Sequence, residues 1–156
     1  MSFVAAPAAP APATPDAIAG DGWWPNLSIA AFRASIRLGT LVTDARARDA
    51  LIGGIISADT QLRDWRAAHE ANDIASLADV PGPQIDGTPR AVILWRRAVY
   101  AYAAADLAET HNDITATDRG RAVAEERAIS ADDHRRNAIV AIRDLLGKTR
   151  SRCALL

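Results

Sequence analysis

The sequence predicts an all-α protein, a helical bundle of about four helices with an extended N-terminal arm and a C-terminal tail. Three observations support this fold class. Apolar residues recur at helical spacing in four stretches, the connections between these stretches are short, and the first part of the chain is rich in Ala and Pro. We divide the 156 residues into a flexible arm (1–26), a helical domain (27–147) and a tail (148–156).

The arm is defined by its composition. Residues 4–20 alternate Ala and Pro and carry almost no charge, which favours an extended, solvated backbone. The pair Trp23 and Trp24, followed by Pro25, marks its end. These two rings have two interpretations. They clamp the arm onto the protein's own helices, because burial of tryptophan is large whatever its partner, or they form an inter-subunit anchor into a neighbouring copy.

A short helix is expected over residues 29–38. Ser28 is suited to its N-cap and Gly39 to its C-terminal stop. A second, much longer helix then begins at Thr43 or Asp44, since either side chain can cap the first turn. The two helices are therefore expected to be separated by only a short connection.

The long helix has an apolar seam with 4-3-4-3 spacing, formed by Leu51, Ile55, Ala58, Leu62 and Trp65. Ile52 and Ile56 widen this seam, so we expect the helix to pack against two neighbours. The pair Gly53–Gly54 lowers helix propensity by roughly 1 kcal/mol per residue relative to Ala. The same pair allows another helix to approach closely.

Residues 73–87 contain two prolines and two glycines and form a predicted loop. Three apolar side chains are expected to dock this loop on the helices: Leu77, Val80 and Ile85. Thr88, with Pro89 at the first helical position, is expected to open the third helix. Its core stripe consists of Val92, Trp95, Val99, Tyr102 and Leu107. The alanine run at 101–105 allows a neighbouring helix to approach.

The last helix is expected over residues 118–146, after a break in the pattern at 111–117. Its core stripe is predicted to be Ile139, Ile142 and Leu146. Gly147 ends the helix, and the tail that follows is first basic and then apolar.

The composition excludes several classes of protein. The net charge of −1 gives no general attraction to nucleic acid. The single cysteine, Cys153, excludes an intramolecular disulfide framework. No apolar run approaches the roughly 18 residues of a membrane helix, and the first residues lack the basic start of a secretory signal. We therefore expect a protein that is soluble and intracellular when made.

No catalytic or metal-binding motif stands out. Glu109, His111 and Asp113 are ligand types, but alternate residues at a helix end do not point together, so no metal site is expected. His69 and His134 are expected at the surface. A phosphate loop is missing, because Gly53–Gly54 has no lysine after it. We expect no enzyme activity and no cofactor.

The end of the tail offers a competing interpretation. The residues Cys153-Ala-Leu-Leu156 match a C-a-a-X prenylation box with basic residues upstream. Matches of four residues are common by chance, and the modification needs a eukaryotic host. An unmodified intact mass of natively produced protein would exclude it.

Several short segments, in order, carry a family resemblance. They are Trp23–Pro25, Trp65-Arg66, Leu77-Ala-Asp-Val-Pro81, Ile85-Asp-Gly87, Arg97-Ala-Val99 and Arg152-Cys153. Their order and spacing resemble the head completion protein (GPL) family of contractile-tailed, peduovirus-like temperate phages. The resemblance covers nearly everything after the arm. The chain departs from the family pattern in its Ala/Pro arm and in a shorter linker at 111–120.

The resemblance implies a structural head-tail connector. Such a protein binds the portal protein after DNA packaging, stabilises the filled head and forms the platform for the tail or neck terminator protein. It implies neighbouring copies in a ring, a dodecamer that matches the portal, with DNA passing through the channel without sequence-specific binding. The expected location is the virion neck, after assembly in the host cytoplasm.

The tail is the hypothesised portal-binding segment. Its basic residues give charge complementarity and its two leucines fill an apolar groove; the set is Lys148, Arg150, Arg152, Leu155 and Leu156. The alternative is a frayed terminus without a partner. For the protein as a whole, the alternative is a generic helical interaction module or small regulator, such as a toxin-antitoxin partner.

Overall fold

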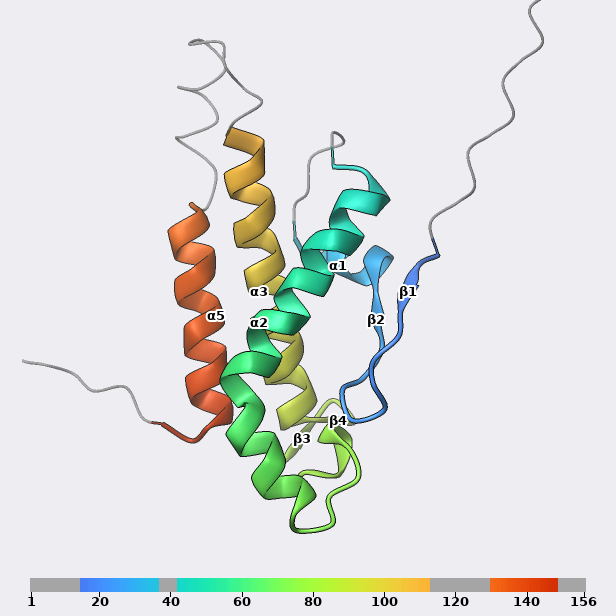
Figure 1. Cartoon of the computed structure of the whole chain (residues 1–156), viewed down its shortest axis with the longest axis vertical. Coiled ribbons are helices and arrows are strands. Elements are labelled where there is room, and N and C mark those ends of the chain that lie inside the picture. Colours follow the sequence, from blue (N-terminus) through green and yellow to red (C-terminus); the bar gives the residue numbers. More distant parts are fainter. Residues whose placement is uncertain (1–14, 37–41, 113–129, 149–156) are drawn as a thin grey trace, which may run out of the picture.

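In the computed structural model the chain is described over residues 15–36, 42–112 and 130–148. These ranges contain four helices and two short antiparallel strand pairs, so the all-α bundle is confirmed (Figure 1). Helix α3 (Arg90–Asn112) lies between α2 (Asp44–Glu70) and α5 (Ala131–Leu145). Both neighbours run antiparallel to α3, and the short helix α1 (Ile29–Ser35) lies on the far side of the bundle from α5.

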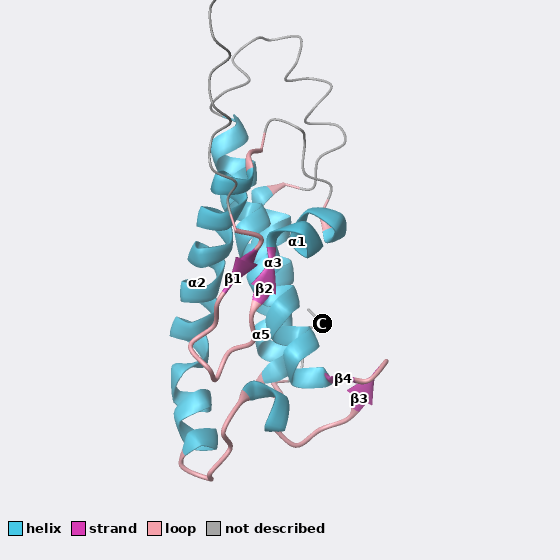
Figure 2. Ribbon diagram, turned by 90° about the vertical axis from the view of Figure 1, so that its right-hand side faces the viewer, coloured by secondary structure: helices cyan, strands magenta, loops and turns pink. Residues whose placement is uncertain are grey.

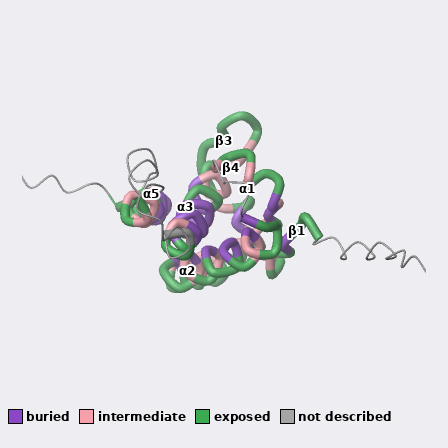
Figure 3. Tube along the Cα trace, turned by 90° about the horizontal axis from the view of Figure 1, so that it is seen from above, coloured by how far each residue is buried: buried purple, intermediate pink, exposed green. Residues whose placement is uncertain are grey.

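The core lies along α3. Its residues Trp95, Ala98, Val99 and Ala103 are fully buried, whereas Tyr102 of the predicted stripe is only half-buried. Buried positions in Figure 3 face inward, between the helices. The close approach expected at the glycine pair is confirmed at Gly54, where an added Cβ would lie 2.5 Å from the Val99 carbonyl oxygen. No charged or polar residue in the described part of the chain is buried.

The predicted boundary of the arm at residue 26 is wrong. Strand β1 (Ala17–Ile18) pairs with β2 (Leu27–Ser28), and Ile18 is buried. Apolar side chains in this stretch gain burial on the bundle, which an Ala/Pro composition count does not show. Residues 1–14 of the predicted arm lie outside the described residues.

Helix α1 is shorter than predicted. Ser28 is its N-cap, as expected, and its Oγ accepts from the Ala31 N–H at 3.0 Å. The Asp16 carboxylate adds a second cap by accepting from the Ala30 N–H at 2.7 Å. The helix ends at Ser35 because Ile36 adopts an extended backbone, while the expected stop at Gly39 lies outside the described residues.

Helix α2 starts at the predicted cap, since the Thr43 Oγ1 accepts from the Arg46 N–H. The seam residues Leu51, Ala58 and Leu62 are buried, and Ile55 and Trp65 pack at its margin. The second packing face was predicted wrongly. Ile52 and Ile56 are 39% and 60% exposed, because no described element covers that side of the helix.

The loop after α2 docks only in part. Leu77, in the 3-10 turn η1 (Leu77–Asp79), is fully buried, and its N–H donates to the Trp23 carbonyl at 3.0 Å. Val80 is half-buried against the core. The prediction for Ile85 is wrong: it is 56% exposed in a hairpin that reaches away from the helices (Figure 2).

This hairpin also moves the start of the third helix. Strand β3 (Gln84–Ile85) pairs with β4 (Thr88–Pro89), and α3 begins only at Arg90. Asp86 and Gly87 both have positive φ, 51° and 68°, as a two-residue turn of the primed type requires. Pro89 therefore ends a strand and does not occupy the first helical position.

The last helix differs from its prediction at two points. Helix α3 continues to Asn112, and α5 begins at Ala131 with Ser130 as its N-cap; the expected helical start at 118 lies outside the described residues. Helix α5 packs on α3 through Ala138, Ala141, Ile142 and Leu145. Leu146 is half-buried, but Ile139 is 47% exposed, because α3 covers only the other side of α5.

Candidate functional site

An aromatic cluster fixes the start of the described chain to the bundle. The four tryptophans lie together: Trp23 meets Trp24 edge-on at 4.4 Å between centroids, and Trp65 edge-on at 5.9 Å. Trp24 stacks on Trp95 at 5.3 Å with an interplanar angle of 7°. The indole N–H of Trp24 also donates to Asp59 Oδ1 at 2.9 Å.

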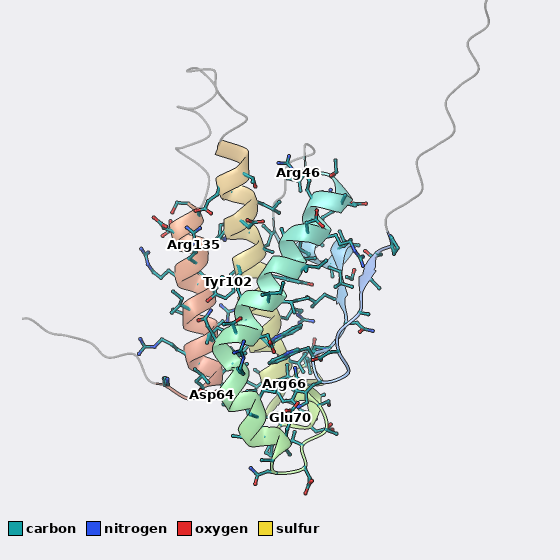
Figure 4. The ribbon with its side chains drawn as sticks, viewed as in Figure 1. Arg46, Asp64, Arg66, Glu70, Tyr102 and Arg135 are labelled. Carbon is teal, nitrogen blue, oxygen red and sulfur yellow. The ribbon has the colours of Figure 1, made fainter. Side chains whose placement is uncertain are left out.

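Arg66 of α2, labelled in Figure 4, contacts two rings of this cluster. Its guanidinium group pairs with Asp21 at 2.6 Å and with Glu70 at 2.7 Å. It also lies 5.2 Å from the Trp23 ring centroid and 5.6 Å from that of Trp24, within the range of cation–π attraction. Burial raises the pKa of Asp21, but hydrogen bonds from the Trp24 N–H and from Arg66 outweigh it and leave that pKa below its ordinary value.

The cluster supports one of the two interpretations of the tryptophan pair. Trp23 and Trp24 are 5% and 4% exposed within their own chain. Almost none of either ring remains for a neighbouring copy, which favours the clamp over the inter-subunit anchor. The signal that sequence reasoning missed is Arg66, whose spacing of four from Glu70 is visible but whose contact with Asp21 is not.

The hypothesised portal-binding tail is described only at its first residue, Lys148. Gly147, with φ of 68°, ends α5, and the Lys148 N–H returns to the Arg143 carbonyl at 2.9 Å, the hydrogen bond of a Schellman cap. Arg90 of α3 donates to the Asp144 carbonyl at 3.3 Å. The first residue of the tail, Lys148, therefore lies at the end of the bundle where α3 begins. Four of its hypothesised contact residues lie outside the described residues: Arg150, Arg152, Leu155 and Leu156.

Within the described residues, no group of three His, Cys, Asp or Glu side chains gathers that could hold a metal ion. Glu109 instead pairs with Arg135, which joins α3 to α5 and lowers the pKa of Glu109. Asp113 lies outside the described residues. His69 is in edge contact with Trp65 at 4.3 Å, and burial lowers the pKa of His134.

Four isoleucines that were predicted to be covered by other elements are exposed: Ile52 and Ile56 on α2, Ile85 on the β3–β4 hairpin, and Ile139 on α5. Ile139 lines an open depression on α5 together with Asp132 and three arginines, Arg135, Arg136 and Arg143. Surfaces of this kind, apolar and bordered by charge, suit protein contacts. No described helix combines the length and the apolar character needed to cross a membrane.

Comparisons with known proteins match the sequence of this chain to one family. The family model for "Phage head completion protein (GPL)" matches residues 18–156. The chain is 30% identical over 128 residues to the head completion/stabilization protein of Escherichia phage P2, covering 82% of this chain and 76% of the relative. It is 25% identical over 142 residues to the probable head completion/stabilization protein of Haemophilus phage HP1 (strain HP1c1), covering 89% and 91%. No solved structure matches the chain.

Proposed function

The chain belongs to the phage head completion protein (GPL) family, and from this premise we propose that it binds the portal vertex after DNA packaging, stabilises the filled capsid and forms the platform for tail attachment. The observation that carries the proposal is the extent of the family match, which spans all four described helices. Head completion is a structural role in the virion. The family match therefore replaces the generic interaction module and small regulator considered from the sequence.

In the proposed assembly, copies of the chain form a ring, a dodecamer that matches the portal. The arrangement of the elements supports head-to-tail contacts: β1 and α5 lie on opposite sides of the body (Figures 1 and 3). Each copy thus has two different surfaces to offer, and a heterologous contact closes into a ring when its rotation is right. The net charge of −1 suits a channel through which DNA passes, since it gives no strong hold on phosphates.

We assign portal contact to the C-terminal tail of the chain, residues 148–156. The surface of the ring that faces away from the portal would then bind the phage's tail or neck terminator protein. Two features support this assignment. The capped end of α5 places the start of the tail, Lys148, at one end of the bundle, and the sequence of the tail combines three basic residues with two leucines. Charge complementarity would set the register of the contact and apolar burial its strength. Assembly takes place in the host cytoplasm.

The test uses filled heads from a phage that lacks this protein, mixed with the purified full-length chain. We expect the chain to co-sediment with the heads, to prevent loss of packaged DNA and to restore tail joining. Deletion of 149–156 should abolish co-sedimentation while the helical circular dichroism stays unchanged. Heads that retain DNA and join tails without the chain would contradict the proposed function.

A matched pair of variants separates the tail contact from general damage. Leu155→Ser with Leu156→Ser removes the two apolar side chains and should weaken head binding by about tenfold or more, since 1.4 kcal/mol is a tenfold change. Ala154→Ser alters the neighbouring residue with little loss of apolar area and should bind as the wild type does. Equal binding by all of these chains, the deletion included, would contradict portal binding by the tail and leave the head completion role standing.

A further inference from the structure

Helix α2 carries an apolar ridge that faces away from the core. Ile52 and Ile56 are one helical turn apart and therefore share a face. They are 39% and 60% exposed, while Leu51 and Ala58 on the inner side are fully buried. We refer to Ile52 and Ile56 as the α2 ridge. No element of the described chain covers it.

The first described residues of the chain lie next to this ridge. Arg48 lies one turn before Ile52, and its Nη1 donates to the carbonyl oxygens of Pro15 and Ala17, both at 3.1 Å. The pairing of β1 with β2 and the burial of Ile18 fix the chain immediately after this point. The described chain therefore begins beside the ridge, at a fixed position.

The residues before Pro15 have the composition of a spacer with an apolar end. Residues 5–14 consist of alanines, three prolines and one threonine, and the preceding four include Met1, Phe3 and Val4. Ala/Pro sequences favour an extended backbone that rises about 3.1 Å per residue, so ten residues reach about 31 Å. The chain's own ridge is about 6 Å, one turn, from Arg48. A spacer of this composition is therefore long enough for the apolar residues to reach beyond their own ridge, to a neighbouring copy.

We propose that Met1–Val4 of one copy bind the α2 ridge of a neighbouring copy, so that the arms are exchanged between subunits. The inference rests on the proposed assembly of several copies and is separate from portal binding by the tail. Both surfaces are apolar, and residues 1–15 carry no charged side chain that would need a partner at the ridge. A pre-extended spacer loses little conformational freedom on binding. A single contact of this kind buries little surface. In a ring, neighbouring copies are held close together, and the high effective concentration of each arm near the next ridge strengthens the contact.

Disulfide trapping tests the exchange with the apolar contacts intact. In a Cys153→Ser background, Ser2→Cys places a thiol beside the apolar residues, and Gly53→Cys places one beside the ridge, at a site with no atom within 4 Å of an added Cβ. The two single variants are mixed at high concentration, with and without portal protein, and oxidised. We expect a covalent dimer that joins one Ser2→Cys chain to one Gly53→Cys chain. Adding Ile52→Ser and Ile56→Ser to the Gly53→Cys chain should reduce the yield of this dimer about tenfold, the equivalent of 1.4 kcal/mol.

Ala67→Cys is the matched control, an exposed position farther along the same helix. Equal dimer yields at positions 53 and 67 would mean random collision and would overturn the proposal. So would a Ser2→Cys, Gly53→Cys double variant that forms only an internally linked monomer, because the arm would then bind its own chain. Absence of the dimer while the chain still co-sediments with portal overturns arm exchange alone. Loss of portal binding by the wild-type chain would contradict the proposed function instead.

Discussion

Gly53 and Gly54 are neighbours in α2 with opposite surroundings. A Cβ at Gly54 would lie 2.5 Å from the Val99 carbonyl oxygen and 3.3 Å from the Ala103 nitrogen, both backbone atoms of α3. A Cβ at Gly53 would meet nothing within 4 Å. Only Gly54 therefore sets how closely α2 and α3 pack, while Gly53 lowers the stability of the helix without a packing gain.

Alanine substitutions at the two glycines should act in opposite directions. Gly54→Ala forces the backbones of α2 and α3 apart and should lower the free energy of unfolding by about 1–3 kcal/mol. Gly53→Ala improves helix propensity at an exposed site and should raise it by about 0.4–1 kcal/mol. Urea denaturation followed by tryptophan fluorescence measures both. A change of the same sign in both variants would contradict this packing.

Individual side chains also show what a sequence pattern leaves open. The clamp by Trp23 and Trp24 was one of two interpretations, because a ring signals burial without naming its partner. The partner is supplied by Trp65, Trp95 and Arg66, which come from two other elements. Contacts between residues far apart in the sequence have no local signature, so the clamp became specific only in the folded chain.

The helices themselves were predictable, and their uncovered faces were not. Helical spacing located α2 and α3 within a few residues, because caps and periodicity are local properties. The same spacing assigned Ile52, Ile56 and Ile139 to the core, and all three are exposed. Periodicity shows which side of a helix is apolar, but the number of neighbouring helices decides how much of that side is covered.

The interface between α3 and α5 has polar contacts at its two ends and apolar contacts in its middle. Glu109 of α3 pairs with Arg135 of α5 near one end, and Arg90 donates to the Asp144 carbonyl near the other. Ala138, Ala141 and Ile142 fill the middle. The ion pair is half-exposed, with side chains 51% and 42% accessible, so its contribution is modest.

This ion pair should make the stability depend on pH in one direction. The hydrogen bond from Arg135 lowers the pKa of Glu109 below its ordinary 4.5. A lowered carboxyl pKa adds stability above pH 4.5, and that stability is lost as the pH falls through the folded-state pKa. The melting temperature of the wild type should therefore exceed that of Glu109→Gln at pH 7, and the difference should shrink below about pH 4.5. A difference that is constant or grows in acid would contradict the pairing.

As a whole molecule, the folded unit begins earlier than the composition of the chain suggests. Strand β1 and the tryptophan clamp lie inside the predicted arm, and both belong to the core. The buried positions contributed by this stretch include Ile18, Trp23 and Trp24. The folded part of the chain therefore includes the described residues from Pro15 onward, well before the predicted boundary at residue 26.

The thermal stability of two truncated chains should show which part of the predicted arm belongs to the fold. Removal of residues 1–14 spares every described core residue, so the thermal transition by circular dichroism should be preserved. Removal of residues 1–26 deletes both clamp tryptophans, and each large aromatic loss costs about 3–5 kcal/mol. Against a typical total of about 5–15 kcal/mol, the cooperative transition should be lost or strongly lowered. Equal melting of both truncated chains would place the boundary elsewhere.

The central position of α3 also determines how the molecule carries a mechanical load. The described chain enters through β1 on one side and leaves after α5 on the other, and the two outer helices run antiparallel to α3 (Figure 1). A pull between Pro15 and Lys148 along the long axis is transmitted from α2 to α3 and from α3 to α5. Both interfaces are then loaded in shear, so many side-chain contacts must yield together. A subunit built in this way resists a stretching force, which loads both interfaces in shear, better than a force that peels one helix away.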